Sequence, residues 1–306
     1  MSMIVAPRTQ SLTEKTAMQV AAVIPVRNRR DVLVRAIRSI QAQTSPVAEI
    51  IIVDDASTDD TPDRVLAMAV EDPRIKLLRQ PARAGASAAR NRGVNAAAAD
   101  WIAFLDSDDE WFPEKMALQA AALSAAPDSV ASFTAQQIVS DDGPAAVFRP
   151  AADISLRDLQ QLNVLSTTSS ALVRRSSLIE VKGFDESLPS CQDWDLWLRL
   201  RALGPFAIVR EPLVSFYQSG TDRISRNMEA VLKGHEVLFA RIESEAQGGP
   251  VFRRRLRAKH QMRMSQIYLK DMGQPRTGFA YALRSMSLWP TKTAFRLAVQ
   301  ALKAIT

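Results

Sequence analysis

Residues 101–109 read Trp-Ile-Ala-Phe-Leu-Asp-Ser-Asp-Asp, five apolar side chains followed by three aspartates within four positions. The continuous apolar run Trp101–Leu105 predicts a short buried strand. Two earlier stretches have the same character: Val20–Val26 is apolar, and Glu49–Val53 is dense in β-branched side chains, which favour strands. The second of these runs directly into Asp54-Asp55. Aspartates therefore follow two of the three predicted strands.

Helical segments separate these strands. Leu33, Ile37 and Ile40 recur at helical spacing, which predicts one amphipathic face. Strands that alternate with helices predict an α/β fold with a mostly parallel sheet flanked by helices. Open sheets of this kind bind ligands at the carboxyl ends of their strands, so both aspartate clusters are expected at a binding edge. The expected helices are Asp31–Gln43, Thr61–Val70 and Ala86–Ala98, with a further strand at Ile75–Leu78.

The rest of the chain divides into a continuation of this domain and a helical tail. We expect a disordered lead-in over residues 1–18, a catalytic domain over 19–226 and a basic helical C-terminal extension over 227–306, with helix breaks near Gly248-Gly249-Pro250, Gly273 and Pro290. The remaining elements expected in the domain are helices at Lys115–Ala125, Leu156–Leu162 and Asp193–Ala202 and strands at Ser129–Ile138 and Ser170–Arg174.

The amino-acid composition indicates what class of protein this is and which metals it can bind. The chain of 306 residues is 47% hydrophobic and 24% charged, which is ordinary for a soluble globular protein. Its single cysteine, Cys191, excludes an internal disulfide and favours a reducing compartment. One cysteine and two histidines do not suit a Cys/His zinc site, so carboxylates holding Mg²⁺ or Mn²⁺ are expected instead. No signal peptide or long apolar span is apparent, and we expect a cytoplasmic protein.

The aspartate run supports two interpretations. Asp106 and Asp108, two positions apart after a strand, can both reach one divalent cation, and Mg²⁺ commonly takes one or two carboxylates plus substrate phosphates. A metal there would neutralise charge on a departing diphosphate. The same run suits a turn or cap before the segment Trp111–Lys115, because Asp is common at helix N-caps. Both interpretations stay open at this stage.

Other polar side chains are candidates for binding a nucleotide. Asp54 and Asp55 could accept hydrogen bonds from a base or ribose, or could cap the helix that follows Thr61. Guanidinium groups suit diphosphate oxygens because they donate hydrogen bonds in a planar fork. Four arginines lie between the third and fourth strands, and of these we assign Arg92 to surface salt bridging. They are Arg79, Arg83, Arg90 and Arg92.

Asp193 is a candidate base. It shares a helical face with Leu196, Trp197 and Leu200, which places a carboxylate at the end of an apolar stripe near a helix start. A carboxylate in that position can take a proton from an acceptor hydroxyl. It can equally be a plain N-cap.

Taken in order, these motifs resemble those of the family 2 inverting glycosyltransferases, which have the GT-A fold. The resemblance covers about residues 20–225. No single motif is specific, but the ordered set is. Its members are Ala22-Val23-Ile24-Pro25-Val26-Arg27-Asn28, Ile52-Val53-Asp54-Asp55-Ala56-Ser57-Thr58-Asp59, Gly85 to Ala89-Arg90-Asn91-Arg92-Gly93, Phe104-Leu105-Asp106-Ser107-Asp108-Asp109, Gly183-Phe184-Asp185-Glu186 and Gln192-Asp193-Trp194-Asp195.

The resemblance implies a nucleotide-sugar donor, a divalent metal and an inverting transfer to an acceptor hydroxyl. It implies that Asp193 is the base and that Asp108 is the direct metal ligand, with Asp106 on the ribose or sharing the metal. For Asp109 we expect only a cap. UDP is the expected nucleotide. The acceptor implied is a glycan or lipid-linked molecule of polysaccharide or cell-envelope synthesis. The residues expected at the donor are Pro25, Arg27, Asp54, Asp55, Arg83, Arg90, Asp106 and Ser107, with Gln192, Trp194 and Arg223 as acceptor or loop candidates.

Two departures from the family pattern stand out. Gln192 precedes Asp193 where the family commonly has Glu, so a like charge that would raise the pKa of Asp193 is missing. His235 and His260 lie in the tail and match no metal-binding histidine of the wider fold. Thr221–Ser225 falls where family members often have a mobile loop over the donor, and Arg223 could reach a phosphate or lie on the surface.

Four other classes of protein fit the sequence less well. A non-catalytic nucleotide-sugar-binding or scaffold protein is supported only by Gln192. A nucleotidyltransferase would share the sheet and the acidic site, but Val23–Arg30 has no glycine for a phosphate loop. A dehydrogenase and a P-loop enzyme are disfavoured, because neither glycine motif is present.

The tail is strongly basic. Residues 227–306 hold 14 Lys and Arg against 5 Asp and Glu, whereas residues 1–226 hold 25 against 28. Phe295, Val299 and Leu302 recur at helical spacing, with Lys292, Arg296 and Lys303 alongside. This pattern is typical of a helix that lies on an anionic membrane, which would make the protein peripheral at the inner face of the cytoplasmic membrane. The stripe could also pack on the catalytic domain or a second subunit. No nucleic-acid partner is expected, because no recognisable binding motif accompanies the charge.

Overall fold

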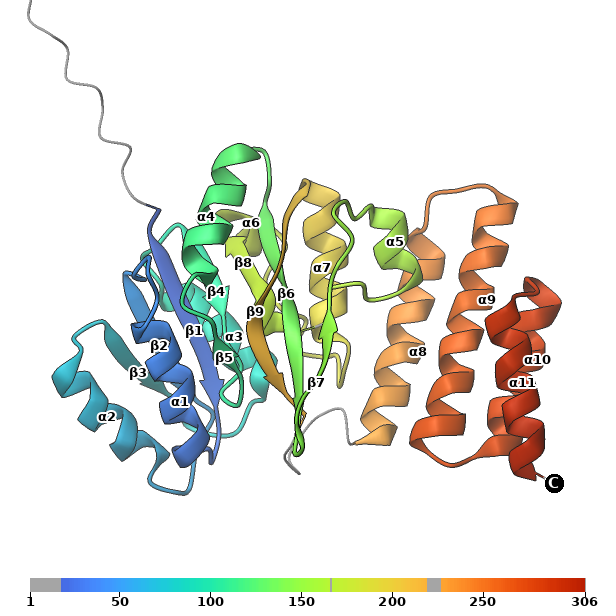
Figure 1. The fold of residues 1–306 in the computed structure, drawn as a ribbon, viewed down its shortest axis with the longest axis horizontal. Coiled ribbons are helices and arrows are strands. Elements are labelled where there is room, and N and C mark those ends of the chain that lie inside the picture. Colours follow the sequence, from blue (N-terminus) through green and yellow to red (C-terminus); the bar gives the residue numbers. More distant parts are fainter. Residues whose placement is uncertain (1–17, 166, 219–226, 306) are drawn as a thin grey trace, which may run out of the picture.

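The computed structural model describes residues 18–165, 167–218 and 227–305. These residues form one sheet with helices on its faces, and the C-terminal helices stand in a row beside it (Figure 1). The predicted α/β class and C-terminal helical extension are therefore confirmed. The expected disordered lead-in falls, apart from Met18, outside the described residues, as does Arg223.

The sheet is mixed. Its order is β3-β2-β1-β4-β8-β6-β9-β5, and β7 pairs with β6. The first four strands are parallel as predicted, and β6 and β9 are also parallel, but β8 runs antiparallel to both β4 and β6, so the sheet is mixed in its second half. The strands are β1 (Val20–Val26), β2 (Glu49–Asp54), β3 (Ile75–Arg79), β4 (Trp101–Phe104), β5 (Glu110–Trp111), β6 (Ala131–Ser140), β7 (Gly143–Phe148), β8 (Ala171–Arg174) and β9 (Phe206–Tyr217).

Three strands were not expected from the sequence: β5, β7 and β9. The longest, β9, contains Pro212, which argues against a central strand. The structure places Pro212 opposite Ala135 of β6, where the register of the two strands shifts. Such irregularities accommodate proline because no ladder hydrogen bond is lost there.

The helices cover the sheet and continue into the tail. The expected breaks at Gly248-Gly249-Pro250, Gly273 and Pro290 are confirmed as the boundaries between α8, α9, α10 and α11. The helices are α1 (Arg30–Gln41), α2 (Thr61–Glu71), α3 (Ala86–Ala96), α4 (Lys115–Ala125), α5 (Leu156–Gln161), α6 (Arg175–Glu180), α7 (Gln192–Leu203), α8 (Met228–Glu245), α9 (Pro250–Gln266), α10 (Pro275–Leu288) and α11 (Lys292–Ile305), with short 3₁₀ (η1, Thr168–Ser170) and π (η3, Ile267–Asp271) turns.

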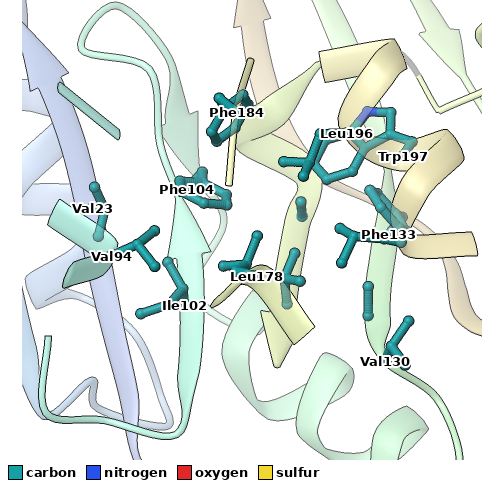
Figure 2. Close-up of a cluster of buried hydrophobic side chains, with 14 of the residues drawn as sticks. Val23, Val94, Ile102, Phe104, Val130, Phe133, Leu178, Phe184, Leu196 and Trp197 are labelled. Carbon is teal, nitrogen blue, oxygen red and sulfur yellow. The ribbon is translucent and has the colours of Figure 1, made fainter. Parts of the chain in front are cut away.

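The core has two layers because successive side chains of a strand face opposite sides. Ala22 and Ile24 of β1 belong to the layer that also holds Leu33 of α1. Val23 belongs to the other layer, where Val94 of α3 lies beside it (Figure 2). Across that second layer, two edge-to-face ring pairs connect the sheet to the segments around α7. They are Phe104 with Phe184, at 5.3 Å between ring centroids, and Phe133 with Trp197, at 4.8 Å.

Gly93 fixes the distance between α3 and the sheet. A Cβ atom on Gly93 would lie 2.4 Å from Cγ1 of Val23 and 3.3 Å from Cγ2 of Val53. Both partners are fully buried in the strands, so neither can move aside freely. The short side chain at this position therefore sets how closely α3 approaches β1.

We expect Gly93→Ala to destabilise the protein. Overpacking costs about 1–3 kcal/mol, which outweighs the gain of somewhat under 1 kcal/mol that Ala brings to a helix interior. Urea unfolding should show a lower midpoint than the wild type. Asn95→Ala, at an exposed position of the same helix, is the matched control and should stay within about 0.5 kcal/mol. Equal stability of the two variants would contradict the close contact.

The C-terminal helices are docked against the domain. Trp194 of α7 shares a hydrophobic cluster with Leu238 and Phe239 of α8 and with Leu256 of α9. The buried His260 ring stacks on Phe239 at 3.8 Å between centroids, and its two nitrogens lie near Glu243 and the carbonyl of Gln160. His235 is also buried, with its Nδ1 2.8 Å from the Val231 carbonyl, so both histidines pack within the helical tail. None of the helices in the described segments combines the length and apolar character needed to cross a bilayer.

Candidate active site

The acidic run forms a turn directly after β4. The Asp109 amide donates to the Asp106 carbonyl at 3.0 Å. The next helix, α4, starts at Lys115 with Glu114 at its N-cap, and no side chain caps it. The interpretation of the run as a helix cap is therefore wrong, because four residues, including the short strand β5, separate the turn from that cap. The acidic turn is defined here as residues 106–109.

The acidic side chains of this turn have different surroundings. Asp106 accepts a hydrogen bond from Arg90 at 2.5 Å and keeps 26% of its side chain exposed. Asp108 lies 3.4 Å from Arg29 and keeps 16% exposed. Asp109 is fully buried and accepts from the Ser169 hydroxyl at 2.6 Å and the Tyr217 amide at 3.2 Å. Only Asp106 and Asp108 can face a ligand.

Asp109 anchors the turn and does not cap a helix. Burial raises the pKa of its carboxyl well above the ordinary value, and the nearby Asp106 and Asp108 charges raise it further. Its bond to Tyr217 joins the turn to the end of β9. Ser107, at the turn's corner, is also mostly buried, with 8% exposed.

A run of hydroxyl side chains that we had not singled out holds the turn in place. Thr168 donates to Asp106, with its oxygen 3.1 and 3.2 Å from the two carboxylate oxygens. Ser169 accepts the Asp106 amide at 3.0 Å while donating to Asp109. These residues form η1, which precedes β8, and β8 lies next to β4 in the sheet. The only trace in the sequence is the hydroxyl-rich stretch Thr167–Ser170.

Asp193 lies in the first turn of α7, near enough to the acidic turn for their charges to interact. Its carboxylate accepts from the Asn163 amide at 3.1 Å. Burial raises its pKa; the Arg90 charge pulls the pKa down and the Asp106 charge pushes it up. These two charges act on Asp193 and also form the ion pair at the acidic turn. The predicted base and the acidic turn are therefore parts of one site.

The neighbours of Asp193 are structural. Trp194 is 3% exposed, donates its indole N–H to the Leu159 carbonyl at 2.6 Å and packs against Phe239. These contacts give Trp194 a packing role, and its predicted role at the acceptor stays a prediction. Gln192 donates to the Leu188 carbonyl at 3.0 Å and remains partly exposed.

Some of the residues predicted to bind the nucleotide are buried and others are exposed to solvent. Pro25 and Asp54 are buried, so their place at the nucleotide stays a prediction. Asp54 accepts from the Ser57 amide at 3.1 Å and from Arg79 at 3.3 Å. Pro25 lies past Val23, the last β1 residue that pairs with β4, where its missing N–H costs no ladder bond.

Asp55 shapes the loop before α3. Its two oxygens accept from the amides of Ala84 and Gly85, at 2.6 and 2.9 Å, and from the side chain of Gln80 at 2.8 Å. Gly85 adopts a φ of 94°, a conformation that glycine alone reaches easily. Asp55 thus positions the start of the helix that carries Arg90. Two of the predicted binding residues, Arg27 and Arg83, are exposed and available to a ligand.

Asn91 joins two of the sequence motifs. Its side chain accepts the Phe184 amide at 2.8 Å and donates to the Phe184 carbonyl at 2.9 Å. Gly183, with φ of 65°, passes so close that a Cβ there would lie 2.3 Å from the Asn91 oxygen. Arg92, for which we predicted a surface salt bridge, donates to the carbonyl of Arg79.

The carboxylates present fit only a metal that takes most of its ligands from elsewhere. No group of three or more His, Cys, Asp or Glu side chains in the described part of the chain is arranged to hold a metal ion. Asp106 and Asp108 can supply two oxygens, which suits a hard cation such as Mg²⁺ or Mn²⁺ completed by phosphate and water.

Comparison with known proteins gives a consistent result. The family model described as Glycosyl transferase family 2 matches residues 21–182. The chain is 28% identical over 297 residues to the succinoglycan biosynthesis protein ExoO of Rhizobium meliloti, covering 88% of this chain and 84% of that protein. Two solved structures share the fold. S. aureus TarS 1–349 in complex with UDP-GlcNAc has a TM-score of 0.68 at 16% identity, over 94% of this chain and 89% of that one. The mannosyltransferase PcManGT of Pyrobaculum calidifontis, in complex with GDP-Man and Mn²⁺, has a TM-score of 0.59 at 18% identity, over 94% and 81%.

Proposed function

Because the chain belongs to glycosyl transferase family 2, we propose that it moves a sugar from a nucleotide-diphosphate sugar to an acceptor hydroxyl with inversion at the anomeric carbon. The observation that carries this proposal is the meeting of Asp193 with the Arg90–Asp106 pair in one site. A base and a diphosphate-binding edge are the two parts that such a transfer needs.

The chemistry assigns a role to each part. Asp193 takes the proton of the acceptor hydroxyl as that oxygen forms its bond to the anomeric carbon. The bond from that carbon to the diphosphate oxygen breaks on the opposite face, and its electron pair leaves with the nucleoside diphosphate. The raised pKa of Asp193 suits this role, because a base works best when its pKa approaches the working pH. Arg90, Arg83 and Arg27 are the candidate cations for the phosphates.

A divalent metal would lie at Asp108, with Asp106 sharing it or facing the ribose. When bound, such an ion supplies charge neutralisation on the departing diphosphate. Support comes from the two partly exposed carboxylates and from the Mn²⁺ in the PcManGT complex. The protein's own contribution is to hold these carboxylates in place through Thr168 and Ser169.

The donor and acceptor are proposed from the relatives alone. UDP is the proposed nucleotide, supported by the UDP-GlcNAc complex of TarS. The acceptor is proposed to be a growing cell-envelope glycan or a lipid-linked sugar, supported by the succinoglycan relative. Incubation with a panel of UDP-, GDP- and dTDP-sugars should release nucleoside diphosphate from at least one donor. Binding of donors without any hydrolysis or transfer would favour a non-catalytic sugar-nucleotide-binding protein instead.

We expect Asp108→Ala to weaken Mn²⁺-dependent binding of UDP about tenfold or more, because one of the two carboxylate ligands is lost. A tenfold loss of affinity corresponds to only about 1.4 kcal/mol of binding free energy. Isothermal titration calorimetry with and without Mn²⁺ measures this. Without metal, the variant should bind UDP at least as well as the wild type, since a negative charge beside the phosphates is gone.

Asp100→Ala is the matched control. Asp100 is exposed and precedes β4 at the end opposite the acidic turn, so its loss should leave both affinities unchanged. If Asp108→Ala binds UDP with Mn²⁺ as tightly as this control does, Asp108 is not a metal ligand.

A further inference from the structure

The helix α11 has an outer surface that the transfer site does not use. Its inner side, formed by Ala294, Leu297, Ala298 and Ala301, is buried in the helical region. On the outer side, Phe295 is 58% exposed, Val299 37% and Leu302 50%. The apolar stripe noted in the sequence therefore faces outward, and it does not pack on the catalytic domain. Figure 1 shows α11 with α10 at the end of the molecule away from β3.

Basic side chains accompany this stripe. Lys292, Arg296 and Lys303 are exposed and recur at helical spacing beside the apolar row. A shallow recess at the start of α11 combines both kinds of side chain, because Lys292, Phe295 and Arg296 line it together with Met286, Pro290 and Thr291. We call Lys292, Phe295, Arg296, Val299, Leu302 and Lys303 the α11 face.

The surrounding charge indicates what covers this face. Residues 250–306 contain twelve Lys and Arg and a single acidic residue, Asp271. Two copies of such a surface would repel one another, which argues against self-association through this face. An anionic surface would be attracted to it, and each Lys or Arg close to an anionic membrane contributes roughly a fivefold gain in binding.

We propose that the α11 face docks on the surface of anionic phospholipid bilayers. Phe295, Val299 and Leu302 enter the boundary between headgroups and acyl chains, while Lys292, Arg296 and Lys303 contact lipid phosphates. An apolar row beside a basic row is the pattern by which helices lie in a membrane surface. This binding needs neither donor nor catalysis, so it can be tested apart from sugar transfer.

The test is co-flotation of the full chain with phosphatidylcholine vesicles that contain or lack phosphatidylglycerol. We expect flotation with the anionic vesicles, little with phosphatidylcholine alone, and loss of binding at high salt, since screening weakens attraction between surface charges. Lys292→Gln with Arg296→Gln should lower partitioning roughly thirtyfold. Phe295→Ser with Val299→Ser should lower it about tenfold or more.

Leu66→Ser with Val70→Ser is the matched control. These α2 side chains are 53% and 86% exposed, so the control removes similar exposed apolar area far from α11, and it should float like the wild type. All six substituted side chains are exposed, and circular dichroism checks that each variant is folded.

Three results would overturn the proposal. The first is wild-type flotation that does not depend on phosphatidylglycerol. The second is flotation of the α11 variants equal to that of the α2 control. The third is a wild-type chain that does not float and that forms a dimer, detected by light scattering, which Phe295→Ser with Val299→Ser converts to a monomer. The α11 face would then be an interface between copies.

Discussion

Replacing Asp193 by Asn should lower the rate of sugar transfer by about a hundred- to ten-thousand-fold, the usual contribution of a positioned general base. Asparagine keeps the size of the side chain and an oxygen that can accept from Asn163, but it cannot take the acceptor's proton. Donor affinity, measured by calorimetry with UDP, should therefore stay near the wild-type value. The loss should appear in kcat and not in donor binding.

The pH profile gives an independent readout for Asp193. Burial raises the pKa of this carboxyl in the folded protein. As the pH is lowered, the wild-type rate should therefore begin to fall at a higher pH than it would with an aspartate of ordinary pKa. The residual rate of Asp193→Asn should not show this decrease at low pH, because Asn does not titrate.

Stability should change in the opposite direction to activity. A carboxyl whose folded pKa is raised binds its proton more tightly in the folded state than in the unfolded state. The free energy of unfolding then falls as the pH rises from the unfolded pKa, about 3.9, through the folded pKa. At a pH above both pKa values, the buried charge of Asp193 destabilises the folded wild type, whereas Asp193→Asn has no such charge. We expect a higher Tm for the variant near neutral pH, and no such gain below the unfolded pKa.

Asp100→Asn supplies the control for both measurements. It removes an exposed carboxylate at the opposite end of β4 and should leave rate, donor affinity and Tm unchanged. Transfer by Asp193→Asn at the control's rate would show that another group is the base. A loss of donor affinity in parallel with rate would show that Asp193 holds the donor instead.

The first half of the fold follows closely from the sequence because its information is local. Apolar runs of strand length and helical periodicity place β1 to β4 and the helices between them, and the carboxyl-end rule places the acidic turn. The second half depends on long-range pairing. β8 lies between β4 and β6, and nothing in its four residues specifies that order.

The same distinction explains which site residues were missed. Thr168 lies 62 positions from Asp106 in the sequence, and Asn163 lies 30 positions from Asp193. Each reaches its partner only because distant elements come together in the fold. The burial of Asp54 was not foreseen for a related reason, since the sequence marks a carboxylate at a strand end but does not reveal that neighbouring segments enclose it.

Replacing Asp195 by Ala should give a large loss of stability, about 3 kcal/mol. Its side chain is 2% exposed. One oxygen accepts from Arg199 through both Nε, at 2.8 Å, and a terminal nitrogen, at 2.6 Å, while the other accepts from Arg241 of α8. Removing this carboxylate leaves two guanidinium groups without their central anion. The estimate is the lower end of the range for a broken buried pair, because Arg199 and Arg241 keep 28% and 34% exposure and can be hydrated.

This loss should also reach the active site. Arg199 donates to the carbonyls of Val181 and Gly183, so Asp195 fixes the segment that Asn91 clamps as well as the first turns of α7 that carry Asp193. Asp185→Ala is the matched control, because Asp185 is a second partner of Arg241 but is 25% exposed, and its loss should cost about 1 kcal/mol or less. Urea unfolding measures both. Equal midpoints for the two variants would mean that the charge network around Asp195 does not hold α7 and α8 together.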